Sequence, residues 1–408
     1  MAVEISTMRR SVSSIGLSWR GCLAAVLIAA LGWGGIVYAA NNSVQGAKKE
    51  EGGFDGDAPT AILIEASSGS VLFEKNADEL RAPSSMMKLM TVEVVFHAIK
   101  QGNVKLTDEY TVSENAWRKG GAPSGTSTMF AAIHSKIAVD DLLHGAIIQS
   151  GNDACIVLAE GMAGSEYTFA TDMMTKRARE LGLTQSTFAN SNGLPDPGNK
   201  MTVRELAKLA RYIIQTYPEF YKLFGEREFT WNKIRQQNRN PLLTSTLEGA
   251  DGLKTGYTKE GGYGMVGSAV QNGIRLIVVV NGLDDPDDRA TEAKKMLEWG
   301  FRNFEVRTLI AAQQPVGYAR VFGGDSRSVR LASSEPIKVM VQKNGTDKLI
   351  ARIVYDGPVR APIEAGQRIG FVKVWRGANL AVETPVYAAE AVGRGSTMRR
   401  AIDGVSEL

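Results

Sequence analysis

Residues 83–102 read PSSMMKLMTVEVVFHAIKQG, and their pattern decides the fold of the region around them. Pro83 and two serines precede a long apolar run that ends at Gly102, which predicts a helix beginning at Ser85. Ser85 and Lys88 stand three residues apart, and residues at this spacing share one face of a helix. The hydroxyl and the amine can therefore meet. Methionines and a leucine flank Lys88 on both sides, which favours a buried lysine.

A buried lysine beside a serine can activate that serine as a nucleophile. Serine is weak until a base takes its proton, and lysine is such a base only in its neutral form. Burial and a neighbouring positive charge both lower the pKa of a lysine. An N-cap serine followed by a solvated lysine is the alternative for an isolated Ser-x-x-Lys. The catalytic interpretation therefore requires a second cation near Lys88.

Two further motifs follow along the chain. Residues 150–152, Ser-Gly-Asn, end an apolar stretch, and their hydroxyl and amide suit a proton relay and a substrate contact. Residues 254–256, Lys-Thr-Gly, supply the second cation and a glycine that lets a substrate backbone approach a strand edge. Taken singly, each motif is also ordinary turn material. Taken together and in this order, the three motifs are typical of penicillin-binding proteins and class A β-lactamases.

The chain resembles the serine D-alanyl-D-alanine carboxypeptidases among the low-molecular-mass penicillin-binding proteins. The resemblance covers residues 58–307, and residues 308–390 are similar to the second domain of that family. Beside the three motifs it rests on ANSNGLPDPGN (189–199), IRQQNRNPLL (234–243), DGLKTGYTKEGGYGMVGSA (251–269) and KKMLEWGFRNFE (294–305).

The resemblance implies a role for each matched residue. It makes Ser85 the acylated nucleophile, Lys88 its general base and Ser150 the relay to the leaving group. It implies no metal and no cofactor. The substrate-binding residues that it implies are Asn152, Lys254, Thr255, Gly256 and Arg289, the oxyanion donors are the backbone N–H groups of Ser85 and Tyr257, and Arg239 supports the site electrostatically.

The chemistry of such a reaction agrees with these residue types. A peptide that ends in a free carboxylate needs a cationic clamp, which Lys254 and Arg289 can provide. The tetrahedral intermediate needs fixed donors, worth about 2.7–4 kcal/mol for one donor in a serine hydrolase. Acylation of Ser85 would release D-alanine, and water would then free the enzyme. The expected substrates are peptidoglycan stem peptides, with β-lactams as covalent inhibitors.

Composition excludes several other classes of protein. The 408 residues carry 47 Lys and Arg against 44 Asp and Glu, a net charge of +3, which argues against a nucleic-acid binder. An ordinary apolar fraction of 44% argues against a disordered chain. Two cysteines and three histidines leave little material for a zinc centre.

The N-terminus has the features of a secretory signal peptide. Basic residues precede the apolar run 21–37, and small residues follow it up to Ala40, so residues 1–39 are expected to be removed. A retained membrane anchor is the alternative. Export would leave Cys155 as the one cysteine, a small buried hydrophobe. The expected location is the periplasm, peripheral on the inner membrane.

The remaining chain is expected to be α+β, with an antiparallel sheet and a helical subdomain, followed by a small all-β domain. A β-hairpin is expected at 60–73 and a strand pair at 263–283. Short alternating runs between 319 and 387 indicate the all-β domain. Helices are expected at 139–160, 203–216 and 292–304. The expected divisions are a linker at 40–57, a catalytic domain at 58–307, the β-rich domain at 308–390 and a tail at 391–408.

The tail has the spacing of a short amphipathic helix. Met398, Ile402, Val405 and Leu408 share one helical face, and two arginines stand beside Met398, which indicates a membrane-surface helix. Acidic residues within the tail leave a solvated, frayed end as the alternative.

Other functions remain open at this point. A peptidoglycan endopeptidase uses the same motifs. A class A β-lactamase would need a Glu-x-x-Leu-Asn-like segment, whereas residues 228–232 carry Trp231 in place of the leucine. A non-catalytic cell-wall binding protein is disfavoured by the intact motifs. A Ser-His-Asp hydrolase is disfavoured because His97 and His144 stand within helical patterns.

Overall fold

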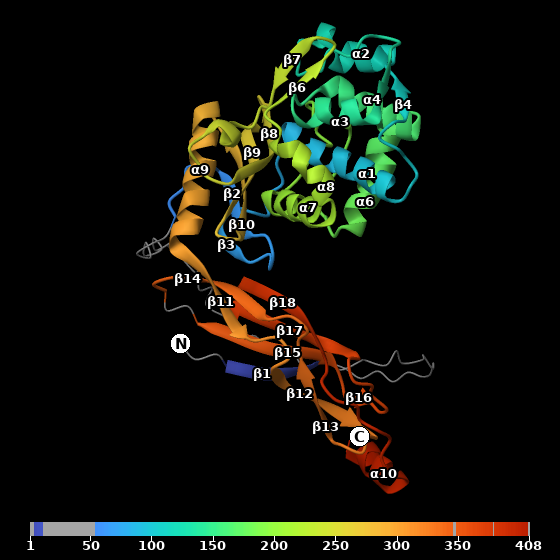
Figure 1. The fold of residues 1–408 in the computed structure, drawn as a ribbon, viewed down its shortest axis with the longest axis vertical. Coiled ribbons are helices and arrows are strands. Elements are labelled where there is room, and N and C mark those ends of the chain that lie inside the picture. Colours follow the sequence, from blue (N-terminus) through green and yellow to red (C-terminus); the bar gives the residue numbers. More distant parts are fainter. Residues whose placement is uncertain (1–3, 11–53, 346–347, 378, 407–408) are drawn as a thin grey trace, which may run out of the picture.

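The computed structural model describes residues 4–10, 54–345, 348–377 and 379–406. Two bodies are stacked along the long axis, a larger one of helices and strands and a smaller one built of strands (Figure 1). Most of the expected signal peptide and linker lies outside the described residues. The described strand β1 (Glu4–Arg10) falls within the expected signal peptide and pairs in parallel with a strand of the smaller body.

A five-stranded antiparallel sheet forms one layer of the larger body. Its order is β3-β2-β10-β9-β8, so that β3 and β8 are its two edges. The expected hairpin and strand pair are both confirmed, and Asn272 and Gly273 form the turn of the pair with positive φ angles. The strands are β2 (Thr60–Glu65), β3 (Val71–Lys75), β8 (Ala250–Thr258), β9 (Gly262–Gln271) and β10 (Ile274–Leu283).

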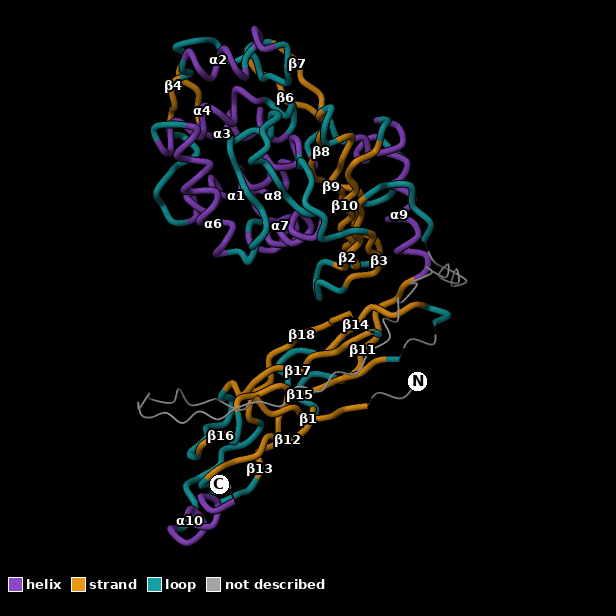
Figure 2. Tube along the Cα trace, turned by 180° about the vertical axis from the view of Figure 1, so that it is seen from behind, coloured by secondary structure: helices purple, strands orange, loops and turns teal. Residues whose placement is uncertain are grey.

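Helices pack on both faces of this sheet, which explains the continuous apolar run of its central strand. Helix α7 (Val203–Thr216) packs against β10 on one face and has the bounds that the sequence predicts. Helix α9 (Pro286–Asn303) packs on the other face (Figure 2). It begins six residues earlier than expected, because Asp285 caps it by accepting a hydrogen bond from Asp287 N at 2.7 Å and Pro286 occupies the first turn.

The remaining helices form a cluster beside α7, seen opposite α9 in Figure 1. The single helix expected at 139–160 is wrong, because the backbone turns at Ser150, whose φ is +63°, and a new helix begins at Asn152. These elements are η1 (Ser84–Met87), α1 (Lys88–Lys100), α2 (Glu114–Gly120), η2 (Ala122–Ser124), α3 (Val139–Ile147), α4 (Asn152–Ala163), α5 (Glu166–Thr168), the π-helical η3 (Phe169–Met174), α6 (Thr175–Glu180), α8 (Pro218–Tyr221) and η4 (Lys222–Gly225). The short η5 (Pro241–Thr244) packs instead against β8 and α9.

Helix α1 runs through the middle of this cluster and is buried on nearly every side. It carries one buried carboxylate, Glu93, which accepts hydrogen bonds from Arg177 of α6 at 2.9 and 3.0 Å and from Tyr217 at 3.1 Å. Burial raises the pKa of Glu93. This buried ion pair ties α1 to α6.

Two small antiparallel strand pairs complete the larger body, and neither was expected from the sequence. They are β4 (Glu109–Thr111) with β5 (Lys136–Ala138), and β6 (Glu228–Trp231) with β7 (Ile234–Gln237).

The smaller body is a β domain, and every alternating run predicted between residues 319 and 387 lies in one of its strands. Along β15 (Leu349–Asp356) buried and half-buried side chains alternate, as expected for a strand with one face on a core. The other strands are β11 (Phe304–Ile310), β12 (Pro315–Phe322), β13 (Ser328–Ala332), β14 (Ile337–Gln342), β16 (Val359–Arg360), β17 (Arg368–Arg376) and β18 (Asn379–Ala388).

The chain ends in helix α10 (Thr397–Ser406), packed at the far end of the β domain. Asp403 accepts a hydrogen bond from Gly323 N at 2.8 Å, and Arg399 donates one to Asp325 O at 2.5 Å. Met398 is 76% exposed. Among the described residues, no helix combines the length and the hydrophobicity needed to span a bilayer.

Polar contacts join the two bodies. Arg376 donates from Nη2 to Val71 O at 2.7 Å, and its guanidinium lies 5.2 Å from the centre of the Phe304 ring. Ser70 Oγ donates to Ala381 O. The β3 edge of the first sheet is thereby held against strands β17 and β18.

Candidate active site

Ser85 and Lys88 meet at the junction of η1 and α1. Ser85 lies in the single turn of η1, and Lys88 is the first residue of α1. Lys88 Nζ donates to Ser85 Oγ at 2.9 Å. The contact predicted from the three-residue spacing is therefore present.

Lys88 is held by two further acceptors in a fully buried position. Its Nζ donates to Asn152 Oδ1 at 2.7 Å and to the backbone oxygen of Asn192. The pKa of Lys88 is lowered to about 8, chiefly by burial. The charge of Arg239 acts in the same direction, while Asp153 and Glu166 oppose the shift. A lysine with such a pKa is neutral in a substantial fraction of molecules near pH 8, as a general base requires.

Lys254 is a second buried lysine of the site, whereas the cation whose charge is found to lower the pKa of Lys88 is Arg239. Lys254 lies on β8 and is 2% exposed, with Nζ donating to Thr255 O at 3.2 Å. Burial lowers the pKa of Lys254 well below its usual value, and the charge of Lys88 acts in the same direction. The two lysines are thus close enough to perturb each other.

Ser150 lies on the tight turn between α3 and α4. Its positive φ is a conformation that costs about 1–3 kcal/mol for a residue with a side chain and persists only where the surroundings enforce it. The first turn of α4, which follows Ser150, is held in place by Asp153. Its carboxylate accepts hydrogen bonds from Met129 N at 2.9 Å, Ala131 N at 3.0 Å and Thr128 Oγ1 at 2.6 Å. This carboxylate holds the loop before α3 against the start of α4.

Gly256 allows the edge strand β8 to approach η1 closely. A Cβ atom at Gly256 would lie 3.1 Å from Met86 N, from Pro83 O and from Ser84 Cβ. Ser84 also bonds across this junction, with its Oγ 2.9 Å from Thr258 Oγ1. The close approach brings the Lys-Thr-Gly strand beside the turn that carries Ser85, and this packing is one reason for a glycine at 256.

A cavity of about 270 Å³ opens above these buried groups. Seven residues predicted for the site line it, together with Ser127 and Tyr263, for which the sequence offered no signal. The predicted lining residues are Ser85, Ser150, Arg239, Thr255, Gly256, Tyr257 and Arg289. Lys88, Asn152 and Lys254 are buried and do not line the cavity.

Arg289 reaches the cavity from the first turn of α9. Its guanidinium lies 5.5 Å from the centre of the Tyr263 ring, and that ring stacks on Tyr257 at 4.0 Å. Nη1 donates to Gly256 O at 3.5 Å, whereas the buried Nε has no hydrogen-bond partner within the described part of the chain. A carboxylate in the cavity would find this guanidinium with donors to spare.

Two residues that hold Lys88 were not predicted. Asn192 supplies a backbone carbonyl, and Glu166 holds the loop that carries it by accepting from Asn192 Nδ2 at 2.8 Å and Ser191 Oγ at 2.7 Å. The Ser-Asn-Gly signal at 191–193 was visible in the sequence. A contact made by a backbone oxygen, however, cannot be recognised from the residue type, because every residue has a backbone carbonyl.

Cys155 is fully buried on α4, as expected of a small hydrophobe. Burial raises the pKa of its thiol to about 11, so that the thiol stays neutral at physiological pH. A nucleophilic cysteine needs a thiol pKa below its usual value.

The segment that weakly matched a β-lactamase motif lies elsewhere. Glu228 is on β6 and forms an exposed ion pair with Arg235 across the β6–β7 hairpin. It does not line the cavity. In the described residues, no group of three or more His, Cys, Asp or Glu lies close enough together to hold a metal ion.

Comparisons with known families agree over most of the chain. Residues 45–285 match the D-alanyl-D-alanine carboxypeptidase family, and residues 304–394 match the C-terminal domain of penicillin-binding protein 5. The chain is 41% identical to D-alanyl-D-alanine carboxypeptidase DacC of Escherichia coli over 351 residues, which cover 86% of this chain and 88% of the relative. It is 38% identical to DacA of Haemophilus influenzae, covering 77% and 80%.

Solved structures have the same architecture. Penicillin-binding protein 5 of Haemophilus influenzae superimposes with a TM-score of 0.73 at 35% identity, covering 84% of this chain and 99% of that one. Penicillin-binding protein D2 of Listeria monocytogenes, solved in an ampicillin-bound form, covers 61% of this chain and 99% of its own, with a TM-score of 0.55 at 27% identity.

Proposed function

The chain belongs to the D-alanyl-D-alanine carboxypeptidase family, and from this membership we propose how its own residues carry out the reaction. It is a serine-type peptidase. We propose that Ser85 is its nucleophile, Lys88 its general base and Ser150 its proton relay. The hydrogen bond from Lys88 to Ser85 at 2.9 Å, made by a lysine whose pKa is near 8, is the observation that carries this proposal.

The proposed acylation moves one proton and exchanges one bond. Neutral Lys88 takes the proton of Ser85 Oγ, and the oxygen attacks the carbonyl carbon of the penultimate D-alanine. The N–H groups of Ser85 and Tyr257 donate to the oxyanion that forms. Protonated Lys88 passes the proton it has taken on to Ser150 Oγ, as Ser150 passes its own hydroxyl proton to the leaving nitrogen. The peptide bond then breaks, D-alanine departs, and Lys88 and Ser150 are back in their starting forms. Water then hydrolyses the ester and restores the hydroxyl of Ser85.

Lys254, Thr255 and Arg289 are proposed to bind the terminal carboxylate of the substrate, and Asn152 to bind its amide. Arg289 has the free donor that such a contact uses. Gly256 is proposed to contribute to substrate binding by letting β8 pack closely on the turn that carries Ser85. Arg239 is proposed to support the site through its positive charge, which lowers the pKa of both lysines.

Peptidoglycan stem peptides are the proposed substrates, and β-lactams the proposed covalent inhibitors. The decisive experiment is mass analysis of purified pentapeptide muropeptides after incubation with the enzyme and with its Ser85→Ala variant. Loss of one alanine with the wild type alone supports the proposal. Cleavage of cross-linked dimers without alanine loss would replace it with an endopeptidase, and rapid turnover of benzylpenicillin would replace it with a β-lactamase.

We propose that the protein is exported, with residues 1–39 removed, and that α10 rests on the periplasmic face of the inner membrane. The exposed side chain of Met398 and the neighbouring basic residues support a weak contact of this kind. Fractionation at low salt tests it. Recovery of the mature protein in the membrane pellet, released by salt, is expected, and recovery of all of it in the soluble fraction would refute the membrane contact.

A further inference from the structure

Arg289 differs from other partly buried arginines of the catalytic domain in what holds it. Arg177 pairs with Glu93 at 2.9 Å, and Arg275 pairs with Asp251 at 2.7 Å. Within the described residues, no carboxylate forms an ion pair with Arg289, and its buried Nε has no hydrogen-bond partner. Its charge is therefore left for a ligand of the cavity that it lines.

Acidic side chains stand near Arg289 in the sequence, but they do not reach its guanidinium. Residues 284, 285, 287 and 288 are aspartates, and all four are exposed to solvent, which screens their charges. Asp285 accepts a hydrogen bond from Asp287 N as the cap of α9. Among the described residues, no carboxylate lines the cavity, whereas Arg239 and Arg289 both do.

The guanidinium of Arg289 lies over the ring of Tyr263. Its Cζ is 5.5 Å from the centre of that ring, whereas the hydrogen bond from Nη1 to Gly256 O is 3.5 Å long. A hydrogen bond of this length is weak. A cation over an aromatic face is attracted by the negative charge of that face, and more strongly where water is excluded. The ring is therefore the stronger of these two contacts.

Tyr263 is itself fixed by its place in the sheet. It lies on β9 directly opposite Tyr257 of β8, and the two rings stack with their centres 4.0 Å apart and their planes at 23°. Such cross-strand aromatic pairs stabilise the sheet that carries them. The ring of Tyr263 thus offers a fixed surface to a long side chain that comes from another element, α9.

An aromatic ring can restrain a guanidinium without neutralising it, whereas a carboxylate would do both. We propose that Tyr263 is a positioning residue, which holds Arg289 in the orientation that binds the terminal carboxylate of the substrate. This inference rests on the proposed function of Arg289. It gives Tyr263 a part in selecting substrates that end in a free carboxylate.

The test compares a peptide that ends in D-Ala-D-Ala with the same peptide as its terminal carboxamide. The readout is the ratio of kcat/KM for the acid to kcat/KM for the amide, measured with the full mature chain. Long incubations at high enzyme concentration, followed by mass spectrometry, make the slow amide reaction measurable. A purely structural role of Tyr263 would lower both rates together and leave this ratio unchanged.

Tyr263→Leu removes the ring and should lower the ratio about 3- to 30-fold, as expected for the loss of a cation–π contact. Tyr263→Phe keeps the ring and should keep the ratio within about twofold of the wild type. Tyr263→Met is a second ringless variant, used if Tyr263→Leu lowers the thermal unfolding midpoint. An unchanged ratio in a folded ringless variant, or an equal loss in Tyr263→Phe, would overturn the proposal.

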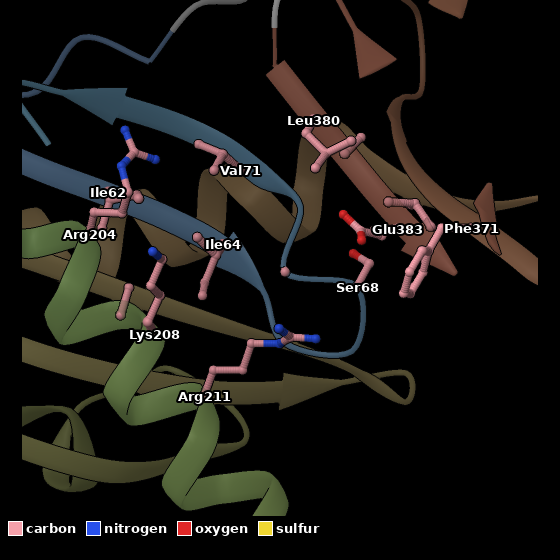
Figure 3. Close-up of a pocket in the computed structure, with 14 residues that line it drawn as sticks. Ile62, Ile64, Ser68, Val71, Arg204, Lys208, Arg211, Phe371, Leu380 and Glu383 are labelled. Carbon is pink, nitrogen blue, oxygen red and sulfur yellow. The ribbon is translucent and has the colours of Figure 1, made fainter. Parts of the chain in front are cut away.

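Phe371→Leu is the matched control. Arg368 lies over the ring of Phe371 at 4.9 Å, a contact of the same kind on the β domain. Figure 3 shows Phe371 on the β17 side of a larger cavity between the two bodies, of about 510 Å³, which shares no lining residue with the cavity of Ser85. Removal of this ring should leave the ratio unchanged.

Arg289→Gln, alone and combined with Tyr263→Leu, separates this inference from the function on which it rests. If Tyr263 acts through Arg289, Tyr263→Leu should change the ratio no further once Arg289 is replaced. A further fall in the double variant would show that Tyr263 acts independently and would overturn its positioning role. A ratio lowered by Arg289→Gln but not by Tyr263→Leu would overturn the positioning role alone. A ratio that Arg289→Gln leaves unchanged would overturn the carboxylate clamp, and this inference with it.

Discussion

The backbone oxygen of Asn192 accepts a hydrogen bond from Lys88 Nζ, although 104 residues separate the two in the chain. Asn192 is held in turn by the carboxylate of Glu166, through its own side chain and through Ser191. The negative charge of Glu166 raises the pKa of Lys88. A residue outside the cavity of Ser85 therefore acts on the proposed base through a single intervening loop.

Glu166→Gln should move the acid limb of the pH profile to lower pH. The variant keeps an acceptor oxygen for Asn192 and removes a charge that raises the pKa of Lys88, which burial has already lowered to about 8. Because the base acts when neutral, activity rises with pH through this pKa. A lower pKa therefore moves the rise to lower pH. The measurement is kcat/KM for a D-Ala-D-Ala peptide against pH. Glu219→Gln, at an exposed position of α8, is the control, and a shift to higher pH in Glu166→Gln would contradict the assignment of the base.

Arg239→Gln should move the same limb in the opposite direction. The charge of Arg239 lowers the pKa of Lys88 and of Lys254, so its removal raises both. Lys88 then stays protonated up to a higher pH, and kcat/KM rises at a higher pH than in the wild type. Arg239→Lys keeps the charge and should restore the profile towards that of the wild type. If both variants lowered activity equally at every pH, Arg239 would have a packing role and no electrostatic one.

Ser85→Ala should abolish covalent labelling by a fluorescent penicillin. The substitution removes the proposed attacking oxygen and leaves the backbone of η1 unchanged. A thermal unfolding midpoint close to that of the wild type serves as the control for folding. Labelling that persisted in a folded Ser85→Ala variant would place the nucleophile elsewhere.

Arg289→Gln should act on substrates with a free terminal carboxylate. A hydrogen bond to a charged group contributes about 1.5–3 kcal/mol, so kcat/KM for such a peptide should fall about 10- to 100-fold. The same peptide with a terminal carboxamide offers no carboxylate, and its already low rate should change far less. An equal loss for both substrates would show that Arg289 does not bind the carboxylate.

Arg177→Met should destabilise the helical cluster without touching the cavity. It would leave the carboxylate of Glu93 buried without its cation, a change that costs about 3–5 kcal/mol in other proteins. Chemical denaturation measures this loss. Arg118→Met, which breaks an exposed pair with Glu114, is the control and should cost less than about 1 kcal/mol. Equal stability of the two variants would contradict the importance of the buried pair.

Local sequence patterns predicted much of this fold and failed where a single residue overrides them. Apolar spacing favoured one helix across residues 139–160, but Ser150 adopts a left-handed backbone and divides it. Spacing also missed the start of α9, where the cap at Asp285 decides the boundary. The alternation within the β domain was easier to interpret, because each strand there keeps one face on the core.

The candidate site, too, has residues that the sequence predicted and contacts that it did not. Side chains with characteristic chemistry were identified from the motifs, and the structure brings Ser85, Lys88, Asn152 and Lys254 together. Contacts that pass through the backbone, such as the one from Lys88 to Asn192, were not predictable from residue types. Supporting carboxylates such as Asp153 and Glu166 were missed because their partners are distant in the sequence.

The proposed nucleophile, its relay and its second cation come from three chain segments, which meet only when β8 packs on η1 and the turn at Ser150 is closed. A molecule that has collapsed without this packing would have the same residues and no site. If Ser85 reacts with penicillin as proposed, covalent penicillin uptake per mole of protein would count the correctly folded molecules directly. That count would allow the yield of refolding, and the loss of folded protein caused by substitutions far from the site, to be measured in a single gel lane.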